Sequence, residues 1–183
     1  MTRRLTSIPL AFSSLLAGLF LFLVSACNSI PEGLDAVNDF ELNRYLGQWH
    51  EIARLDHSFE RGLTDVTATY TLRDDGGLKV VNRGFNPSKG KFEEAVGRAY
   101  FLGSPQTASL KVSFFGPFYG GYHVIALDRS NYGYALVSGP TRDYLWILAR
   151  DKQLTEPILK LLTDKANQAG FDTSKLIYVA HTR

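Results

Sequence analysis

Short segments in which apolar and polar residues alternate, separated by turn residues, fill residues 47–149. Alternation with a period of two is typical of strands that bury one face. Residues 74–77 have the composition of a tight hairpin turn, and residues 103–105 interrupt the pattern again. Such a regular succession predicts an all-β fold, an eight-stranded antiparallel up-and-down barrel with room for one small ligand. The predicted strands are 49–54, 65–72, 78–83, 92–102, 108–115, 122–127, 134–137 and 144–149.

One segment after these strands has helical spacing instead. Thr155 can cap its start, Pro157 suits a first helical turn, and Gly170 suits its end. The sequence therefore predicts one C-terminal α-helix packed on the barrel wall, followed by a short final strand over residues 176–180. The apolar face of the helix consists of Ile158, Leu161, Leu162 and Ala166.

The chain begins with Arg3 and Arg4, an apolar stretch over residues 8–24, and the run Ser25-Ala26-Cys27. A positive start, an apolar stretch and small residues before a cleavage point are typical of a secretory signal. We expect residues 1–26 to be a lipoprotein signal peptide, 27–40 an acylated tether and 41–183 one barrel domain. The alternative for the apolar stretch is an uncleaved membrane-spanning helix.

The residues before Cys27, the only cysteine, resemble the bacterial lipobox. This resemblance implies that Cys27 becomes the first residue of the mature protein and carries three acyl chains. Asn28 in place of aspartate implies sorting to the outer membrane, with the protein on its periplasmic face. Anchoring by two or more acyl chains is stable, whereas a single chain binds a membrane only marginally.

Composition and motifs argue against several other classes of protein. The 20 basic and 18 acidic residues nearly balance and form no long basic run, so we expect no nucleic-acid partner. The four histidines lack metal-site spacing, and residues 116–121 have no following helix or lysine to form a phosphate loop. We expect no metal and no other cofactor. Glu51 is the one interior carboxyl that could act as a general base, but a hydrogen-bonded structural role is the commoner one.

Three motifs carry a resemblance to a known family. Gly47-Gln48-Trp49 opens the first predicted strand, Thr141-Arg142-Asp143-Tyr144 precedes the eighth, and Arg150 follows it. Together they resemble the lipocalins, and residues 114–122 and 139–148 resemble the bacterial outer-membrane lipocalins in particular. The resemblance implies that Gly47, Trp49 and Arg150 are structural: Trp49 plugs one end of the barrel and Arg150 lies across its ring as a cation–π pair.

The lining of the barrel follows from alternation, since side chains two apart share a face of a strand. The set is mostly apolar, and its small residues leave space for an acyl chain. Its polar members either bond one another and water or hold a ligand head group, and the sequence leaves both open. The expected ligand-binding residues are Glu51, Ala53, Ala68, Tyr70, Val80, Asn82, Ala95, Gly97, Val112, Phe114, Tyr122, Val124, Tyr144 and Trp146, with Ala99, Ala126 and Leu148 also pointing inward.

These features together predict a binding protein, not an enzyme. The resemblance implies that it takes up a fatty acid or lysophospholipid, for lipid storage or transport in outer-membrane maintenance. One alternative is a lipid-modifying enzyme on the same barrel, and another is a structural lipoprotein with a filled barrel. Phe115, Phe118 and Tyr119 can form an exposed aromatic patch, which suggests a homodimer.

Overall fold

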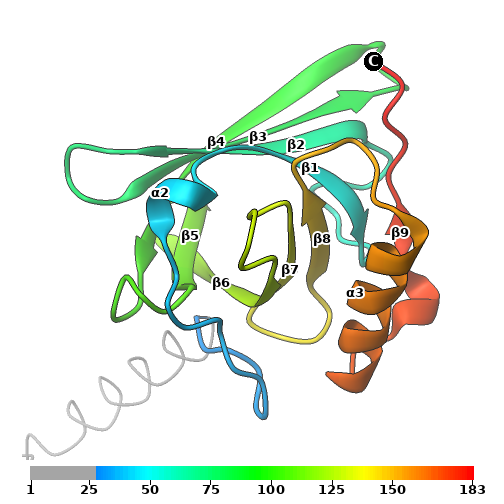
Figure 1. Cartoon of the computed structure of the whole chain (residues 1–183). Coiled ribbons are helices and arrows are strands. Elements are labelled where there is room, and N and C mark those ends of the chain that lie inside the picture. Colours follow the sequence, from blue (N-terminus) through cyan, green and yellow to red (C-terminus); the bar gives the residue numbers. More distant parts are fainter. Residues whose placement is uncertain (1–27) are drawn as a thin grey trace, which may run out of the picture.

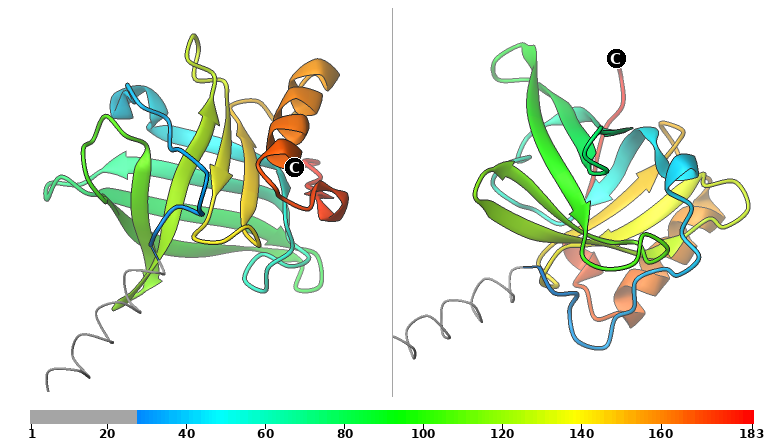
Figure 2. Two further views of the ribbon diagram at one scale, coloured as in Figure 1. Left: turned by 90° about the horizontal axis from the view of Figure 1, so that it is seen from below. Right: turned by 90° about the vertical axis from the view of Figure 1, so that its left-hand side faces the viewer.

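The computed structural model of the protein describes residues 28–183, so the predicted signal peptide and Cys27 lie outside the described residues. The strands follow each other around a single sheet in chain order, and pairing of β1 with β2 closes it into a barrel (Figures 1 and 2). All eight predicted strands are present, which confirms the antiparallel barrel. They are β1 (Gly47–Arg54), β2 (Thr64–Leu72), β3 (Leu78–Asn86), β4 (Lys91–Phe101), β5 (Ser109–Phe115), β6 (Phe118–Leu127), β7 (Tyr134–Ser138) and β8 (Leu145–Ala149).

Strand β6 begins at Phe118, four residues before the predicted start at Tyr122. Phe115 and Phe118 pair directly across the turn at Gly116-Pro117, so β5 and β6 form a tight hairpin. The glycines at 120 and 121 belong to this strand, β6.

Strands β3 and β4 form a hairpin that extends beyond its neighbour. β3 pairs with β4 out to Asn86↔Lys91, whereas the pairing of β4 with β5 runs from Phe101↔Leu110 to Arg98↔Ser113. Residues 91–97 of β4 therefore lie beyond the β5 pairing, as the projecting hairpin in Figure 1 shows.

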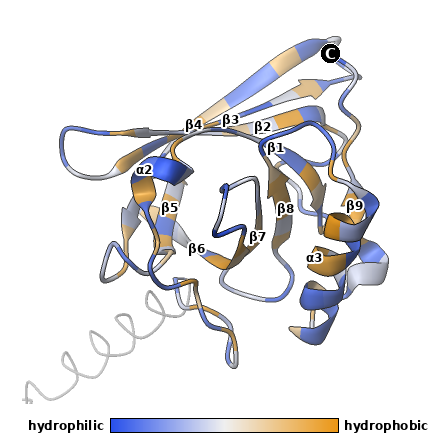
Figure 3. Cartoon of the chain, viewed as in Figure 1, coloured by the Kyte–Doolittle hydropathy of each residue, from blue (hydrophilic) through white to orange (hydrophobic). Residues whose placement is uncertain are grey.

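The predicted helix and final strand lie on the outside of the barrel. Helix α3 (Glu156–Gln168) is followed by a 3-10 turn, η1 (Thr173–Lys175), and by β9 (Ile177–Tyr178), which pairs with β1. Figure 3 shows hydrophobic residues alternating with hydrophilic ones along α3. Leu162 and Ala166 are buried against the outer face of the sheet, as their spacing predicts. Among residues 28–183, no helix combines the length and the apolar character needed to cross a bilayer.

Two separate apolar cores result from this arrangement. One fills part of the barrel interior and includes Trp49, Tyr70 and Val124. The other lies between the barrel wall and α3 and includes Leu145 and Ile147. On β8 the two cores alternate as expected, because Trp146 and Leu148 point inward while Leu145 and Ile147 face the helix.

Trp49 closes one end of the barrel, which we call the closed end. Its side chain is 0% exposed, and its indole Nε1 donates a hydrogen bond to the backbone oxygen of Tyr45, at 2.8 Å, in the short helix α2 (Leu42–Tyr45). The guanidinium of Arg150 lies 4.0 Å from the centre of the Trp49 ring, which confirms the predicted stacking. Gly47 has a φ of +92°, a conformation that favours glycine, and brings the backbone close to Arg150.

Arg150 also holds the closed end through the backbone. It donates hydrogen bonds to the carbonyl oxygens of Gln48, Arg44 and Leu46, at 2.7, 2.8 and 2.9 Å. The opposite end of the barrel, which we call the mouth, carries the connections at residues 55–63, 87–90, 116–117 and 139–144.

Two inward placements predicted from strict alternation are wrong. The pairing of β1 with β8 shifts between Glu51 and Ala53, so Ala53 packs in the outer core near α3 and Arg54 points inward instead. The pairing of β6 with β7 shifts between Val124 and Ala126, which likewise turns Ala126 to the outer core. A β-bulge adds one residue to a strand, and therefore exchanges the two faces beyond it.

Candidate ligand-binding site

The remaining predicted lining residues that lie in strands share the inner face of the barrel. Cross-strand partners lie on the same face, and Trp49 pairs with Ala68, Ala68 with Asn82, and Asn82 with Ala95. Tyr70, Val80 and Val124 belong to the inner core, and five further residues are partly buried against it or against its neighbours on this face. These are Ala68, Val112, Phe114, Tyr122 and Trp146.

On strands β3 and β4, burial along this inner face decreases from the closed end toward the mouth. Trp49, Tyr70 and Val124 are buried, whereas Asn82, Val112 and Phe114 keep part of their surface accessible and Ala95 is exposed. Inward side chains that met a filled core would be fully buried, as they are at the closed end. The part of the inner wall formed by β3, β4 and β5 is therefore accessible on its mouth side, and the inner wall is mostly apolar.

Three tyrosines meet in the deep part of the barrel. The hydroxyl of Tyr122 lies 2.7 Å from that of Tyr45 and 2.8 Å from that of Tyr70, so the three form one hydrogen-bonded chain. Burial raises the pKa of all three hydroxyls well above the ordinary value for tyrosine. They remain uncharged at neutral pH, and Tyr70 and Tyr122 satisfy each other instead of being left for a ligand.

A buried cluster of charged side chains lies nearer the mouth. Arg54 Nη1 donates to Glu51 Oε1 at 2.6 Å, and its Nη2 donates to the backbone oxygen of Glu60 at 2.7 Å. Glu60 Oε2 lies 3.0 Å from His57 Nε2 and accepts a hydrogen bond from Trp146 Nε1 at 3.1 Å. Glu51 and Arg54 come from β1, while His57 and Glu60 come from the connection over residues 55–63. The cluster thus ties this connection to the inner wall.

The pKa values of the two carboxyls of the cluster are shifted in opposite directions. Burial, and then the nearby charge of Glu60, raise the pKa of Glu51 well above its ordinary value, although Arg54 opposes the shift. Burial alone would raise the pKa of Glu60 too, but His57, Trp146 and Arg54 together lower it. Glu51 is therefore the carboxyl that more readily holds a proton, and Glu60 the one that stays ionised.

Comparison with known proteins identifies the fold family. The family model described as a lipocalin-like domain matches residues 40–181. The outer membrane lipoprotein Blc of Escherichia coli K12 is 58% identical over 160 residues, covering 86% of this chain and 90% of that protein. The chain belongs to the lipocalin family. Among solved structures, insecticyanin of the tobacco hornworm has a similar fold, with a TM-score of 0.67 and 24% sequence identity. The alignment covers 85% of this lipocalin chain and 88% of that one.

More distant relatives extend across kingdoms. The Blc protein of Vibrio cholerae is 54% identical to this lipocalin over 157 residues, covering 86% of this chain and 92% of that protein. Mouse apolipoprotein D is 32% identical over 182 residues, covering 91% of this chain and 92% of that protein.

Among the buried polar atoms of the predicted lining of this lipocalin, the side-chain oxygen of Asn82 has no hydrogen-bond partner in the described part of the chain. This atom, Oδ1, is buried and accepts no hydrogen bond within the described residues, whereas Glu51, Tyr70 and Tyr122 are all bonded. Of the two alternatives for these polar groups, mutual bonding therefore holds for Glu51, Tyr70 and Tyr122. Asn82 is the group among them that has a hydrogen-bonding atom to offer a ligand.

Tyr144 lies at the mouth and not within a strand, since β8 begins one residue later. Its ring stacks near those of Trp146 and His57, with centroids 6.2 and 6.1 Å apart. His57 also stacks on Phe59, at 3.9 Å. These aromatic rings line the mouth of the lipocalin barrel next to the charged cluster.

The residues of this interior that sequence reasoning missed include Tyr45, Arg54, His57 and Glu60. Arg54 lay within a predicted strand, but strict alternation assigned it to the outer face. His57 and Glu60 lie in a connection with no periodic pattern, so only the rarity of buried charge marks them once the fold is known. Tyr45 lies in a helix of four residues, which is too short for a periodic signal.

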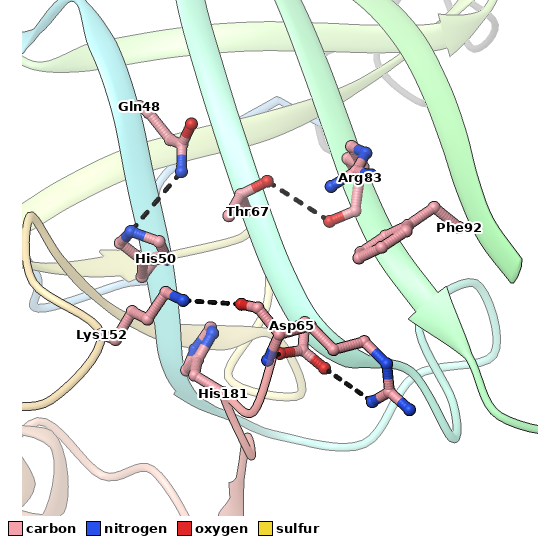
Figure 4. A pocket seen from close by; sticks show the side chains of 9 residues that line it. Gln48, His50, Asp65, Thr67, Arg83, Phe92, Lys152 and His181 are labelled. Atoms are coloured by element: carbon pink, nitrogen blue, oxygen red, sulfur yellow. Dashed lines mark hydrogen bonds and ion pairs between the residues drawn. The ribbon is translucent and has the colours of Figure 1, made fainter.

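A pocket lies on the outer face of the lipocalin barrel, beneath the C-terminal residues (Figure 4). It encloses about 180 Å³ and is lined mainly by polar and charged groups. Asp65 Oδ1 accepts hydrogen bonds from the backbone nitrogens of Thr182 and Arg183, at 2.6 and 2.7 Å, which clamps the C-terminal residues there. This pocket does not suit an acyl chain. Its lining residues are Gln48, His50, Asp65, Thr67, Arg83, Phe92, Lys152, His181 and Arg183.

The free energy of unfolding of Glu51→Gln, compared with that of the wild type, is expected to increase as pH rises. The folded state raises the Glu51 pKa above the unfolded value of about 4.3, so the native protein binds the proton more tightly and loses stability as pH climbs above that value. Glutamine cannot titrate, so Glu51→Gln gains stability relative to the wild type over this window. Urea unfolding between pH 5 and pH 8 measures the difference, and a difference that does not change with pH would refute the assigned shift.

Proposed function

We propose that this lipocalin is a non-catalytic, membrane-anchored binding protein that takes up a fatty acid or a lysophospholipid. The observation that carries the proposal is the inner wall, which is apolar and accessible on its mouth side but packed shut at the closed end. An acyl chain can lie along Ala68, Val112 and Phe114. Its polar head then lies toward the mouth, near Asn82 and the buried charged cluster.

The proposed location is the periplasmic face of the outer membrane. Cys27 follows a signal-like leader, and several of the most similar relatives carry the name outer membrane lipoprotein. Acyl chains on Cys27 would hold the barrel beside a large supply of lipid and raise the local concentration of ligand. Lipid storage or transport for outer-membrane maintenance is the role that fits this arrangement.

Ala95→Trp is expected to weaken binding of a fluorescent fatty acid by about tenfold or more. Ala95 faces the open part of the inner wall, so an indole there occupies ligand space without displacing core side chains. Excluding two buried methylenes of the ligand already accounts for about that loss. The matched control is Val96→Trp, because the neighbouring Val96 is 58% exposed and points to the other face of the strand.

The outcomes of this test separate the candidate functions. Equal affinities for the two variants would exclude the barrel interior as the site. Organic extracts of protein purified without detergent should contain a fatty acid or lysophospholipid by mass spectrometry, whereas a filled structural barrel would release none. Turnover of an added lysophospholipid that Glu51→Gln abolishes would establish the enzymatic alternative instead.

The homodimer stays a prediction. It rests on Phe115, Phe118 and Tyr119, and sedimentation at high protein concentration tests it.

A further inference from the structure

The tip of the β5–β6 hairpin is the most exposed aromatic surface among the described residues. Phe115 is 81% exposed and Phe118 is 78% exposed, and they are direct partners across the turn. Single exposed hydrophobic residues are common, but two adjacent aromatic rings at the end of a projecting hairpin form a patch that water solvates poorly.

Cationic side chains flank this tip. Lys111 Nζ lies 5.1 Å from the centre of the Tyr119 ring, and the guanidinium of Arg98 lies 5.9 Å from it. Aromatic rings with lysine and arginine beside them are the composition of surfaces at the membrane–water interface. There the rings enter the acyl boundary and the cations meet lipid phosphates. This charge pattern favours a lipid surface over a second copy of the same cationic tip.

The N-terminal end of the described chain lies on the same hairpin. The backbone oxygen of Asn28 is 3.0 Å from the position that a Cβ on Gly121 would occupy, and the backbone of Asn28 and Ser29 interacts with the ring of His123. The absence of a side chain at Gly121 thus permits this close approach. In Figure 2, the described part of the chain begins beside these strands.

The first described residue, Asn28, is therefore close to the aromatic tip. Gly121 is three residues from Phe118 along β6, which is about 10 Å at the rise of a strand. Cys27 directly precedes Asn28, and consecutive Cα atoms are about 3.8 Å apart. Asn28, the residue that follows the proposed acylation site in the sequence, thus lies within roughly 15 Å of the tip.

The segment after Asn28 does not act as a free spacer. Arg142 Nη2 donates to the backbone oxygen of Glu32 at 2.7 Å, and Val37 N donates to Val124 O at 2.8 Å. Phe40 N donates to Gln106 O at 2.9 Å. Residues 28–40, which the sequence suggested as a tether, therefore lie along the barrel wall, and an anchored Cys27 would hold the barrel directly on the bilayer.

We propose that the β5–β6 hairpin tip inserts into the leaflet that anchors Cys27 and turns the mouth of the barrel toward the bilayer. The tip belongs to the mouth, because the connection at residues 116–117 lies at that end. Next to it, β4 extends past its pairing with β5, and the inner-wall residue Ala95 is exposed. A lipid can then pass between the leaflet and the inner wall without crossing bulk water. This inference rests on the proposed lipidation of Cys27.

Fluorescence quenching by brominated lipids tests the orientation. The full-length lipidated protein is reconstituted in phosphatidylethanolamine–phosphatidylglycerol vesicles, with and without brominated acyl chains, as Phe118→Trp or as Leu72→Trp. Leu72 is the matched control, because it is 57% exposed and lies at the closed end of β2. We expect a blue-shifted emission that brominated vesicles quench for Phe118→Trp alone. Absence of that quenching, or equal quenching of both variants, overturns the proposal.

A second variant tests the consequence for ligand transfer. Burial of each phenylalanine favours the membrane-facing orientation by about tenfold or more. Phe115→Ser/Phe118→Ser should therefore take up a fluorescent fatty acid from vesicles at least about tenfold more slowly, with unchanged affinity for the same ligand in solution. An unchanged rate of uptake contradicts the inference.

Flotation of the vesicles shows whether a negative result contradicts the membrane anchor or only the insertion of the hairpin tip. If the protein does not float with vesicles and carries no acyl mass, Cys27 is not lipidated. Both this inference and the proposed location are then wrong. Protein that floats but shows no quenching removes only the insertion of the tip. A dimer in sedimentation that Phe115→Ser/Phe118→Ser abolishes would assign the tip to a second copy of the chain, and would also overturn the inference.

Discussion

Replacing Trp49 by alanine is expected to cost about 3–5 kcal/mol of the free energy of unfolding, the range for removing a large buried aromatic side chain. The Trp49 ring is fully buried between Arg150, at 4.0 Å, and Tyr45, whose ring centre is 4.6 Å away. Alanine leaves a cavity at the closed end and removes both contacts. Urea unfolding monitored by circular dichroism measures the loss.

Trp49→Phe is the matched control for this prediction. Phenylalanine keeps an aromatic face for Arg150 but loses the Nε1 hydrogen bond to the Tyr45 backbone, at 2.8 Å. Its cost should be clearly smaller than that of alanine. A loss below about 1 kcal/mol for Trp49→Ala would mean that the closed end contributes little to folding, against the usual cost of such cavities.

The barrel and the closed end were predictable because both depend on local patterns. Alternation with a period of two shows directly which face of a strand is buried, and turn residues mark where each strand ends. Trp49 and Arg150 could be paired in advance through the family motif that they belong to. The four-residue helix that carries Tyr45 has no comparable pattern, and its contact with Trp49 became visible only in three dimensions.

The candidate site was predictable only where the strands are regular. Ala68, Val80 and Val112 point inward as expected, since alternation continues unbroken through their positions. At Ala53 a bulge exchanges the two faces of β1, and no residue type in that stretch announces it. Alternation predicts the buried face only while a strand is regularly pleated. One inserted residue therefore reverses the inward or outward assignment of every residue beyond it.

The partners of buried polar groups were a further part that the sequence could not supply. Glu51 pairs with Arg54 three residues along the chain, but Glu60 reaches Trp146 across 86 positions. Such contacts depend on how a connection folds back over the mouth. The structure therefore changes the interpretation of Glu51 from a lone interior carboxyl to a member of a charged cluster.

Arg54→Met is expected to cost about 3–5 kcal/mol at pH 7–8, the range for removing one partner of a buried ion pair. Arg54 is 1% exposed and is bonded both to the Glu51 carboxyl and to the Glu60 backbone, so methionine leaves a buried carboxyl without its cation. The cost should be smaller near pH 5. Glu51 already has a raised pKa, and without Arg54 it takes up a proton more readily still, so it is increasingly neutral as pH falls.

Two further variants decide whether the buried charge is the cause. Glu51→Gln/Arg54→Met replaces the pair by uncharged groups and should recover much of the loss, because no carboxylate is then left without a partner. Arg61→Met removes an arginine that pairs with Asp56 at 2.7 Å but is 65% exposed, and such surface pairs contribute little to stability. If Arg54→Met costs no more than Arg61→Met, or if the double variant is as unstable as the single one, the cluster does not hold the connection over residues 55–63 against the inner wall.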